Sequence, residues 1–176
     1  WMLRGMPVST RHYHLRALAL STLLLFSGLS LALDKPIGPA LLRISGLVTQ
    51  PNMQQQAVFD MAMLQALPQH SFTTQTPWYA EPVKFTGPLL RDVLAAAGAK
   101  GEGITAIALN DYRTEIPFSD ALKYDLIVAT LMNDQPMPVR EKGPLFVVYP
   151  FDSKAALRSS VYYERSIWQL KRMSIE

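Results

Sequence analysis

The amino-acid sequence predicts an α+β fold built on a mixed β-sheet. Apolar runs of strand length outnumber helical patterns, and the helical patterns are short. Of the 176 residues, 49% are hydrophobic and 18% are charged, which is the balance of a globular chain and not of a disordered one. No repeat or low-complexity tract is present, so one domain with one core is expected.

The N-terminal residues 1–32 predict a secretory signal. They carry three arginines and no acid ahead of and within the apolar stretch 17–33, and Ser30 and Ala32 provide a small-x-small cleavage site. An uncleaved membrane anchor is the alternative, because this stretch is at the short end of a membrane span. We therefore expect a signal peptide, a single domain over 33–176 and a periplasmic location.

Charge and cysteine content exclude several classes of function. Beyond residue 32, 14 Lys and Arg face 14 Asp and Glu, so the basic excess belongs to the signal segment. Without a block of like charges, nucleic acid and lipid surfaces are poor partners for the cleaved domain. The chain has no cysteine, which excludes thiolate nucleophiles and Cys-ligated metals.

The sequence also contains few residues that could form a known catalytic motif. His70 is the only histidine beyond residue 32, which excludes a His-rich metal site, and no G-x-S-x-G elbow is present. The sequence therefore predicts no catalytic and no metal-ligating residues.

The elements of the first half are predicted in chain order. A strand is expected over 40–48, followed by a polar loop over 49–56. Asp60 is a suitable N-cap for a short helix over 61–67, because its carboxylate can accept from the first free backbone N–H groups. A strand over 70–76 follows.

The second half alternates strands with short helical segments. A strand over 83–85 leads into the amphipathic stretch 89–99, where Pro88 in the first turn and Gly98 just past the end mark a helix. Further strands are then expected, at 104–109, 112–117, 126–132, 145–150 and 167–175.

Aromatic, basic and hydroxyl residues gather at strand ends and loops, where binding sites tend to lie. They lie in four stretches, 72–79, 110–113, 140–143 and 162–168. Aromatic faces combined with guanidinium forks and hydroxyls suit a flat, nitrogen-rich heterocycle. Taken singly, these residues are better explained as structural or solvated residues, so only the grouping supports the prediction.

The order of the segments resembles the sulfite-oxidase-type molybdopterin-binding domain over roughly residues 40–175. The resemblance is carried by FTGPLLRDVLAAAGA, NDYRTEIPFSDAL, LIVATLMNDQPM, KGPLFVVYP and RSIW. It implies a mixed, barrel-like α+β domain.

The chain differs from the enzymes of this family at the position of the metal-ligating residue. The resemblance implies a molybdenum-ligating cysteine about four residues before a tryptophan, and counting back from Trp78 reaches Thr74. Phe146 stands where the enzymes carry an arginine, whereas Arg165 and Ser166 match a cofactor-contacting pair. A threonine hydroxyl is a poor substitute for a thiolate at such a metal.

These departures resemble the cysteine-less, periplasmic branch of the family. That resemblance implies a non-catalytic binder of a free reduced pterin, with molybdopterin a less favoured ligand and no covalent cofactor. It also implies that occupancy is reported to a membrane sensor controlling cyclic-di-GMP, either a diguanylate cyclase or phosphodiesterase or a histidine kinase. The expected ligand-binding residues are Thr74, Thr76, Trp78, Asp111, Tyr112, Arg140, Arg165, Ser166 and Trp168.

Two other functions remain open at this stage. One is a molybdenum or tungsten oxidoreductase with a non-cysteine metal environment. The other is a periplasmic adaptor whose pocket is vestigial.

Overall fold

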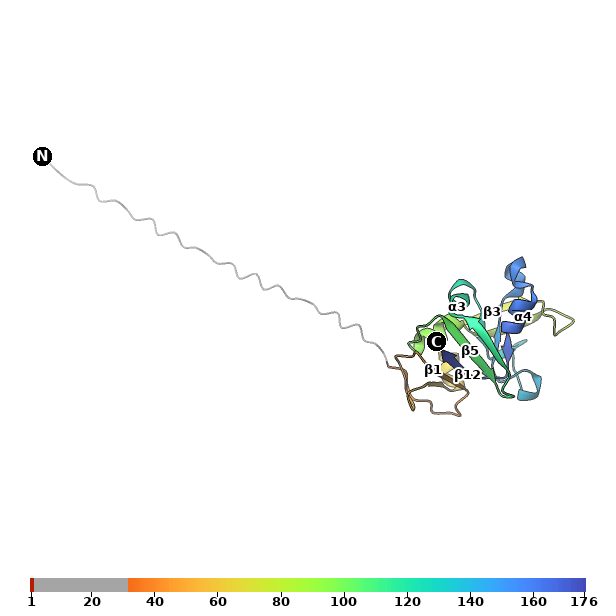
Figure 1. Ribbon diagram of the computed structural model, residues 1–176, viewed down its shortest axis with the longest axis horizontal. Coiled ribbons are helices and arrows are strands. Elements are labelled where there is room, and N and C mark those ends of the chain that lie inside the picture. Colours follow the sequence, from red (N-terminus) through yellow and green to blue (C-terminus); the bar gives the residue numbers. More distant parts are fainter. Residues whose placement is uncertain (2–31) are drawn as a thin grey trace. The chain divides into compact units, whose positions relative to one another are not determined.

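The computed structural model describes Trp1 and residues 32–176 (Figure 1). Nearly all of the predicted signal segment, residues 1–32, lies outside the described residues. Within the described part of the chain, no helix is long and apolar enough to cross a membrane.

The largest sheet has five strands and mixed direction, as the sequence predicts. The parallel pair β1 and β12 lies at its centre, and every other pairing is antiparallel. In Figure 1, β1, β12 and β5 lie side by side. In sheet order the strands are β2 (Ala57–Phe59), β1 (Leu42–Gly46), β12 (Leu170–Ile175), β5 (Gly103–Ala108) and β6 (Arg113–Pro117).

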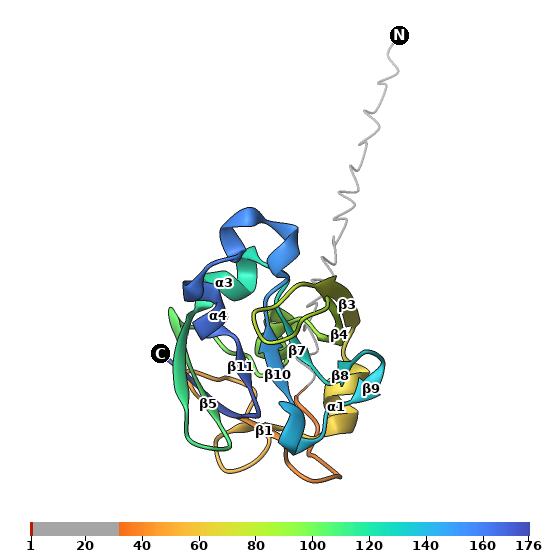
Figure 2. The same ribbon diagram turned by 90° about the vertical axis from the view of Figure 1, so that its right-hand side faces the viewer.

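Two smaller sheets complete the β-structure, and no sheet of the described residues closes into a barrel. The mixed α+β fold is therefore confirmed, with the described strands divided among three open sheets and without a closed barrel. The four-stranded sheet is β3 (Gln69–Thr74), β4 (Val83–Pro88), β8 (Leu131–Met132) and β9 (Gln135–Pro136). The three-stranded sheet, visible in Figure 2, is β11 (Ile167–Trp168), β10 (Phe146–Val148) and β7 (Ile127–Ala129).

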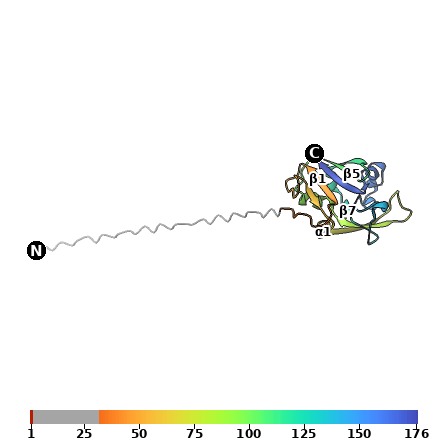
Figure 3. The ribbon, with the colours of Figure 1, turned by 90° about the horizontal axis from the view of Figure 1, so that it is seen from below.

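The helices are short and lie in the connections between strands. Within residues 32–176, four are α-helical: α1 (Met61–Ala66), α2 (Leu90–Ala96), α3 (Phe118–Lys123) and α4 (Ser160–Arg165). Three are single 3₁₀ turns: η1 (Val139–Glu141), η2 (Phe151–Ser153) and η3 (Ala155–Leu157). In Figure 3, α1 and β7 are seen from below together with β1 and β5.

Two predicted strands are divided in the structure. The run 126–132 becomes β7 and β8, which pair in different sheets on either side of Thr130. The run 167–175 is divided at Gln169, whose φ of 52° is left-handed and ends the extended conformation. Strand β2 was not expected, because three residues are too few to show a period.

The helix predicted ahead of Gly98 is present and ends as its sequence indicates. Helix α2 stops at Ala96, and Gly98 follows with a φ of 62° and donates its N–H to the Ala95 carbonyl. A Cβ at this position would collide with the Thr49 hydroxyl. Glycine is required here for both conformation and space.

The core packs between the sheets and is rich in aromatic rings. Its largest fully buried side chains include Tyr149, Phe59, Phe85, Phe146 and Phe151. Burying such rings supplies much of the hydrophobic driving force in a chain without disulfides.

Asp60 caps α1, as predicted, and also fastens the segment before β1. One carboxylate oxygen accepts from the Met63 N–H at 2.9 Å, and the other accepts from Ile37 and Gly38 at 2.9 and 2.8 Å. The hydrogen bonds from Met63, Gly38 and Ile37 lower the pKa of Asp60. The ionised carboxylate therefore holds two separate segments together.

We predict that Asp60→Asn lowers the Tm by a few degrees at neutral pH. Because the folded-state pKa is lowered, the stabilisation is fully present above the unfolded-state pKa of roughly 3.9 and is lost as the pH falls through the folded-state value. The difference in Tm between wild type and variant should accordingly shrink below about pH 4. Thermal unfolding followed by circular dichroism across this range measures it. Glu81→Gln, at an exposed carboxylate, is the control; an equal Tm difference at all pH values contradicts the prediction.

Candidate functional site

A cavity of about 450 Å³ opens between the turn after β5, helix α4 and the loop after β3. This volume is in the range of small-molecule sites. Its walls are formed by Pro77, Trp78, Ala108, Asn110, Tyr112, Ser160, Tyr163, Glu164, Ser166, Ile167 and Trp168. We call this cavity the aromatic pocket.

The Trp78 indole is the centre of the aromatic pocket. Its ring centroid lies 5.5 Å from that of Trp168, 5.6 Å from Phe146 and 6.2 Å from Tyr163, all in edge-to-face arrangements. Rings that meet edge to face fix one another in orientation. The pocket therefore has rigid aromatic walls against which a flat ligand can stack.

Lys142 places a cation beside these walls. Its ammonium lies 4.0 Å from the Trp168 ring centroid and 5.6 Å from that of Tyr79. Partial burial lowers the pKa of Lys142. The position is fixed by the backbone, since the Lys142 carbonyl accepts from the Gln169 N–H at 2.9 Å.

The polar groups of the pocket fall into two sets. The Tyr112 hydroxyl donates to the Glu164 carbonyl at 3.3 Å, and the Ser166 hydroxyl donates to the Tyr162 carbonyl at 2.9 Å. By contrast, the Glu164 carboxylate and the Ser160 hydroxyl have no hydrogen-bond partner among residues 32–176. These two groups are available to a ligand.

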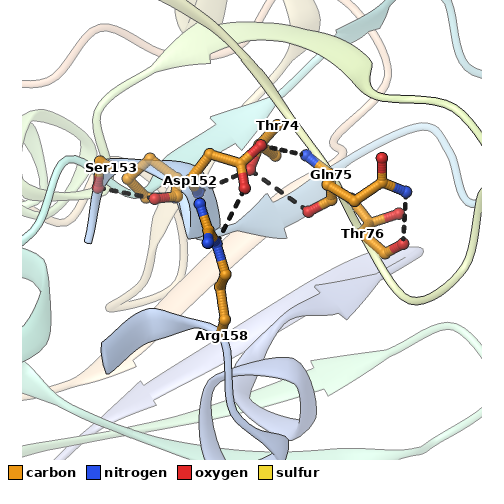
Figure 4. A network of polar contacts seen from close by, with 7 residues as sticks. Thr74, Gln75, Thr76, Asp152, Ser153 and Arg158 are labelled. Atoms are coloured by element: carbon orange, nitrogen blue, oxygen red, sulfur yellow. Dashed lines mark hydrogen bonds and ion pairs between the residues drawn. The ribbon is translucent and has the colours of Figure 1, made fainter. Parts of the chain in front are cut away.

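The Thr74 hydroxyl, in contrast, is fully engaged (Figure 4). Thr74 is 1% exposed, and its Oγ1 accepts the Asp152 N–H at 3.0 Å. Asp152 in turn accepts the Gln75 N–H at 2.7 Å and the Arg158 Nε–H at 3.1 Å. Thr74 thus joins the end of β3 to the η2 turn and does not face the pocket.

The aromatic pocket brings together four of the residues predicted from the sequence: Trp78, Tyr112, Ser166 and Trp168. Thr76 lies next to it, in a hollow of about 400 Å³ that shares Pro77 and Tyr163 with the pocket. The Thr76 hydroxyl accepts the Trp78 N–H at 3.3 Å and so helps to set the loop that carries the indole.

Arg165 lies outside the aromatic pocket, although its neighbour Ser166 lines it. Its guanidinium pairs with Asp120 at 2.8 Å, and the same carboxylate oxygen accepts the Tyr149 hydroxyl at 2.8 Å. Burial and Asp120 together raise the pKa of Tyr149. The guanidinium therefore holds α4 to α3 through a buried carboxylate.

Two further predicted residues also stand away from the pocket. Arg140 is 84% exposed and pairs with its neighbour Glu141 at 3.6 Å. Asp111, at a φ of 63°, shapes the turn after β5 and contacts Arg172 at 3.8 Å. The left-handed conformation of this turn explains why an aspartate stands at position 111, because short polar residues tolerate that conformation.

Comparison with known protein families identifies the family of the chain. The family model described as the oxidoreductase molybdopterin-binding domain matches residues 40–156, more than half of the chain. The chain belongs to this family. No match was found among curated proteins.

The residues present do not fit the metal half of a molybdopterin cofactor. At Thr74, where the resemblance places the metal ligand, the only side-chain oxygen is buried and accepts a backbone N–H. Within residues 32–176, no group of three His, Asp or Glu side chains is placed to hold a metal ion. The aromatic pocket, however, offers ring faces on which a planar ligand can stack.

Several pocket residues were missed by the reasoning from sequence. Tyr163 and Glu164 lie in a stretch that the sequence singled out, but their helical spacing was not used to separate the pocket face of α4 from its other side. On α4, Tyr163 and Glu164 face the pocket while Arg165 pairs with Asp120. Asn110 lies in the stretch 110–113 that the sequence singled out, but it was not among the expected ligand-binding residues, and it also lines the wall.

We predict that Thr74→Val destabilises the protein by about 1–3 kcal/mol, because the Asp152 N–H loses its acceptor. Thr74→Ser keeps the hydroxyl and is the matched control. Urea unfolding of both variants measures the free energy of unfolding. A Thr74→Val variant as stable as Thr74→Ser would contradict the role assigned to this hydroxyl.

Proposed function

We propose that the protein is an exported, non-catalytic binding protein for a reduced pterin, and that the aromatic pocket holds the ligand. The observation that carries the proposal is the combination of rigid aromatic walls with a threonine at the family's metal-ligand position. The pocket keeps what a pterin ring needs, while the chain offers no thiolate to a metal.

The ring recognition follows from the pocket chemistry. A pterin is flat and carries an amino group and ring N–H groups, so it needs stacking surfaces and hydrogen-bond acceptors. Trp78, Tyr112 and Trp168 supply the aromatic faces, and the unpaired Glu164 carboxylate supplies an acceptor. Glu164, and not the expected Asp111, supplies the acidic acceptor, because Glu164 lines the pocket and Asp111 does not.

The signalling role completes the proposal. The protein resides in the periplasm, and pterin occupancy is reported to a membrane-bound sensor that controls cyclic-di-GMP. Such reporting requires that the ligand favour one of two conformations, since equal affinity for both would shift nothing. The support for this role is the family membership together with the absent cysteine.

The deciding experiment analyses the ligand that the protein carries. The protein is exported in cells that make pterins and molybdenum cofactor, purified gently and denatured, and the released material is measured by pterin fluorescence after oxidation and by elemental analysis for Mo and W. Stoichiometric pterin without metal is expected. Stoichiometric metal would instead establish the oxidoreductase alternative with a non-cysteine metal environment.

We predict that Tyr112→Ala weakens binding of a dihydropterin about tenfold, because it removes one wall. Tyr112 is 48% exposed, so the variant should fold. Anaerobic titration followed by tryptophan fluorescence reports binding directly, because Trp78 and Trp168 both line the pocket. Leu122→Ala, at an exposed position on α3, is the matched control. Unchanged affinity in Tyr112→Ala would favour a vestigial pocket.

A further inference from the structure

The outer face of the five-stranded sheet carries a row of three arginines across its strands. Arg43 on β1 is in register with Arg172 on β12, Arg172 with Ile107 on β5, and Ile107 with Arg113 on β6. Side chains in register point to the same face of a sheet. We call Arg43, Arg172 and Arg113 the arginine row.

The arginine row has little compensation from acidic groups. Among residues 32–176, Arg43 and Arg113 make no ion pair or side-chain hydrogen bond, and Arg172 has only the 3.8 Å contact with Asp111. The Arg172 Nε–H is buried and has no hydrogen-bond partner. A buried donor without an acceptor costs free energy and calls for an explanation.

The arrangement is unfavourable for the isolated protein in a second way. Neighbouring strands lie about 4.8 Å apart, so the like charges of Arg43 and Arg172 repel at close range. Ile107, in register between Arg172 and Arg113, is 8% exposed, so packing against this apolar residue can account for the aliphatic stems but not for the guanidinium charges. An anionic partner would relieve this repulsion at the exposed parts of the guanidinium groups.

An apolar hollow borders the same end of the sheet. It measures about 340 Å³ and includes Arg43 and Lys171 with the apolar side chains of Leu41, Leu109, Val139 and Leu170. Leu109 and Val139 are 42% and 53% exposed. A partner that fits here therefore carries apolar side chains beside its acids.

Acidic residues at the opposite end of the same sheet face limit the kind of partner that can bind. Two residues further along the strands, Ser45, Ser174 and Thr105 are in register with Glu115, and Glu176 accepts from Thr105 at 3.4 Å. A flat anionic membrane or a long nucleic acid would meet these acids as well as the arginines. A short protein segment crossing the sheet meets only the arginines.

We propose that the arginine row and the adjoining hollow form a docking surface for an acidic, leucine-containing segment of a partner protein. The row spans four strands, or about 15 Å, which an extended segment of about five residues covers. The proposal does not depend on pterin binding, so the failure of either proposal can be recognised without the other.

The test uses a short fluorescein-labelled peptide rich in Glu and Leu and the same peptide with Lys in place of Glu. Fluorescence anisotropy with the full domain at low ionic strength should show at least about tenfold tighter binding of the Glu peptide. Binding should weaken about tenfold in Arg43→Glu and again in Arg113→Glu, and added salt should weaken it in wild type. Lys154→Glu, an exposed charge reversal on the η2–η3 segment, is the matched control and should bind as wild type does.

Equal binding of the two peptides, or equal effects of Arg43→Glu and Lys154→Glu, would overturn the proposal. Tighter binding to vesicles containing anionic lipid than to the Glu peptide would also overturn it, in favour of a membrane surface. Arg43→Gln separates docking from folding, since removing one of two repelling charges should leave the Tm unchanged or raised while weakening peptide binding. A lowered Tm with unchanged peptide binding would assign Arg43 a structural role and overturn the proposal.

Discussion

The insertion of β12 between β1 and β5 is the constraint on which the rest of the domain depends. β12 pairs in parallel with β1, the first strand of the domain, and in antiparallel with β5, from the middle of the chain. It buries Met173 and Ile175 on the core side. Because its pairing partners are far away in sequence, the central sheet forms only when most of the chain is in place. The same strand follows directly from β11, which carries the Trp168 wall of the aromatic pocket.

The Thr74 position shows how a hydroxyl can occupy the place of a metal ligand without leaving a defect. In the family resemblance this position holds a thiolate that faces a cofactor. Here the threonine oxygen accepts the Asp152 N–H, and the Asp152 carboxylate accepts from Gln75 and Arg158. The three contacts satisfy the buried Thr74 hydroxyl and the carboxylate of Asp152. The threonine at this position is thus part of a local network that ties the end of β3 to the η2 turn.

The fold was predictable from sequence to the extent that its elements are local. The Asp60 cap, the Gly98 terminus and the strand at 104–109 follow from capping, turn chemistry and apolar runs. The division of the strands into three sheets did not follow, because pairing depends on contacts between distant segments. At the site, Trp78 and Trp168 were predictable as loop and strand-end aromatics. The place of Arg165 was not, since its partner Asp120 lies 45 positions away in sequence.

Gln169 lies between the aromatic pocket and the arginine row along the chain. Its left-handed backbone ends β11 one residue after Trp168, and β12 brings Arg172 to the outer face three residues later. Its amide nitrogen donates to the Val139 carbonyl at 2.6 Å, which ties the same point to the border of the apolar hollow. The proposed ligand, stacked on the indole, and the proposed partner, bound at the guanidinium, would therefore both contact one short stretch of chain. Thermodynamic reciprocity then applies: whatever factor the ligand imposes on the partner's affinity, the partner imposes on the ligand's.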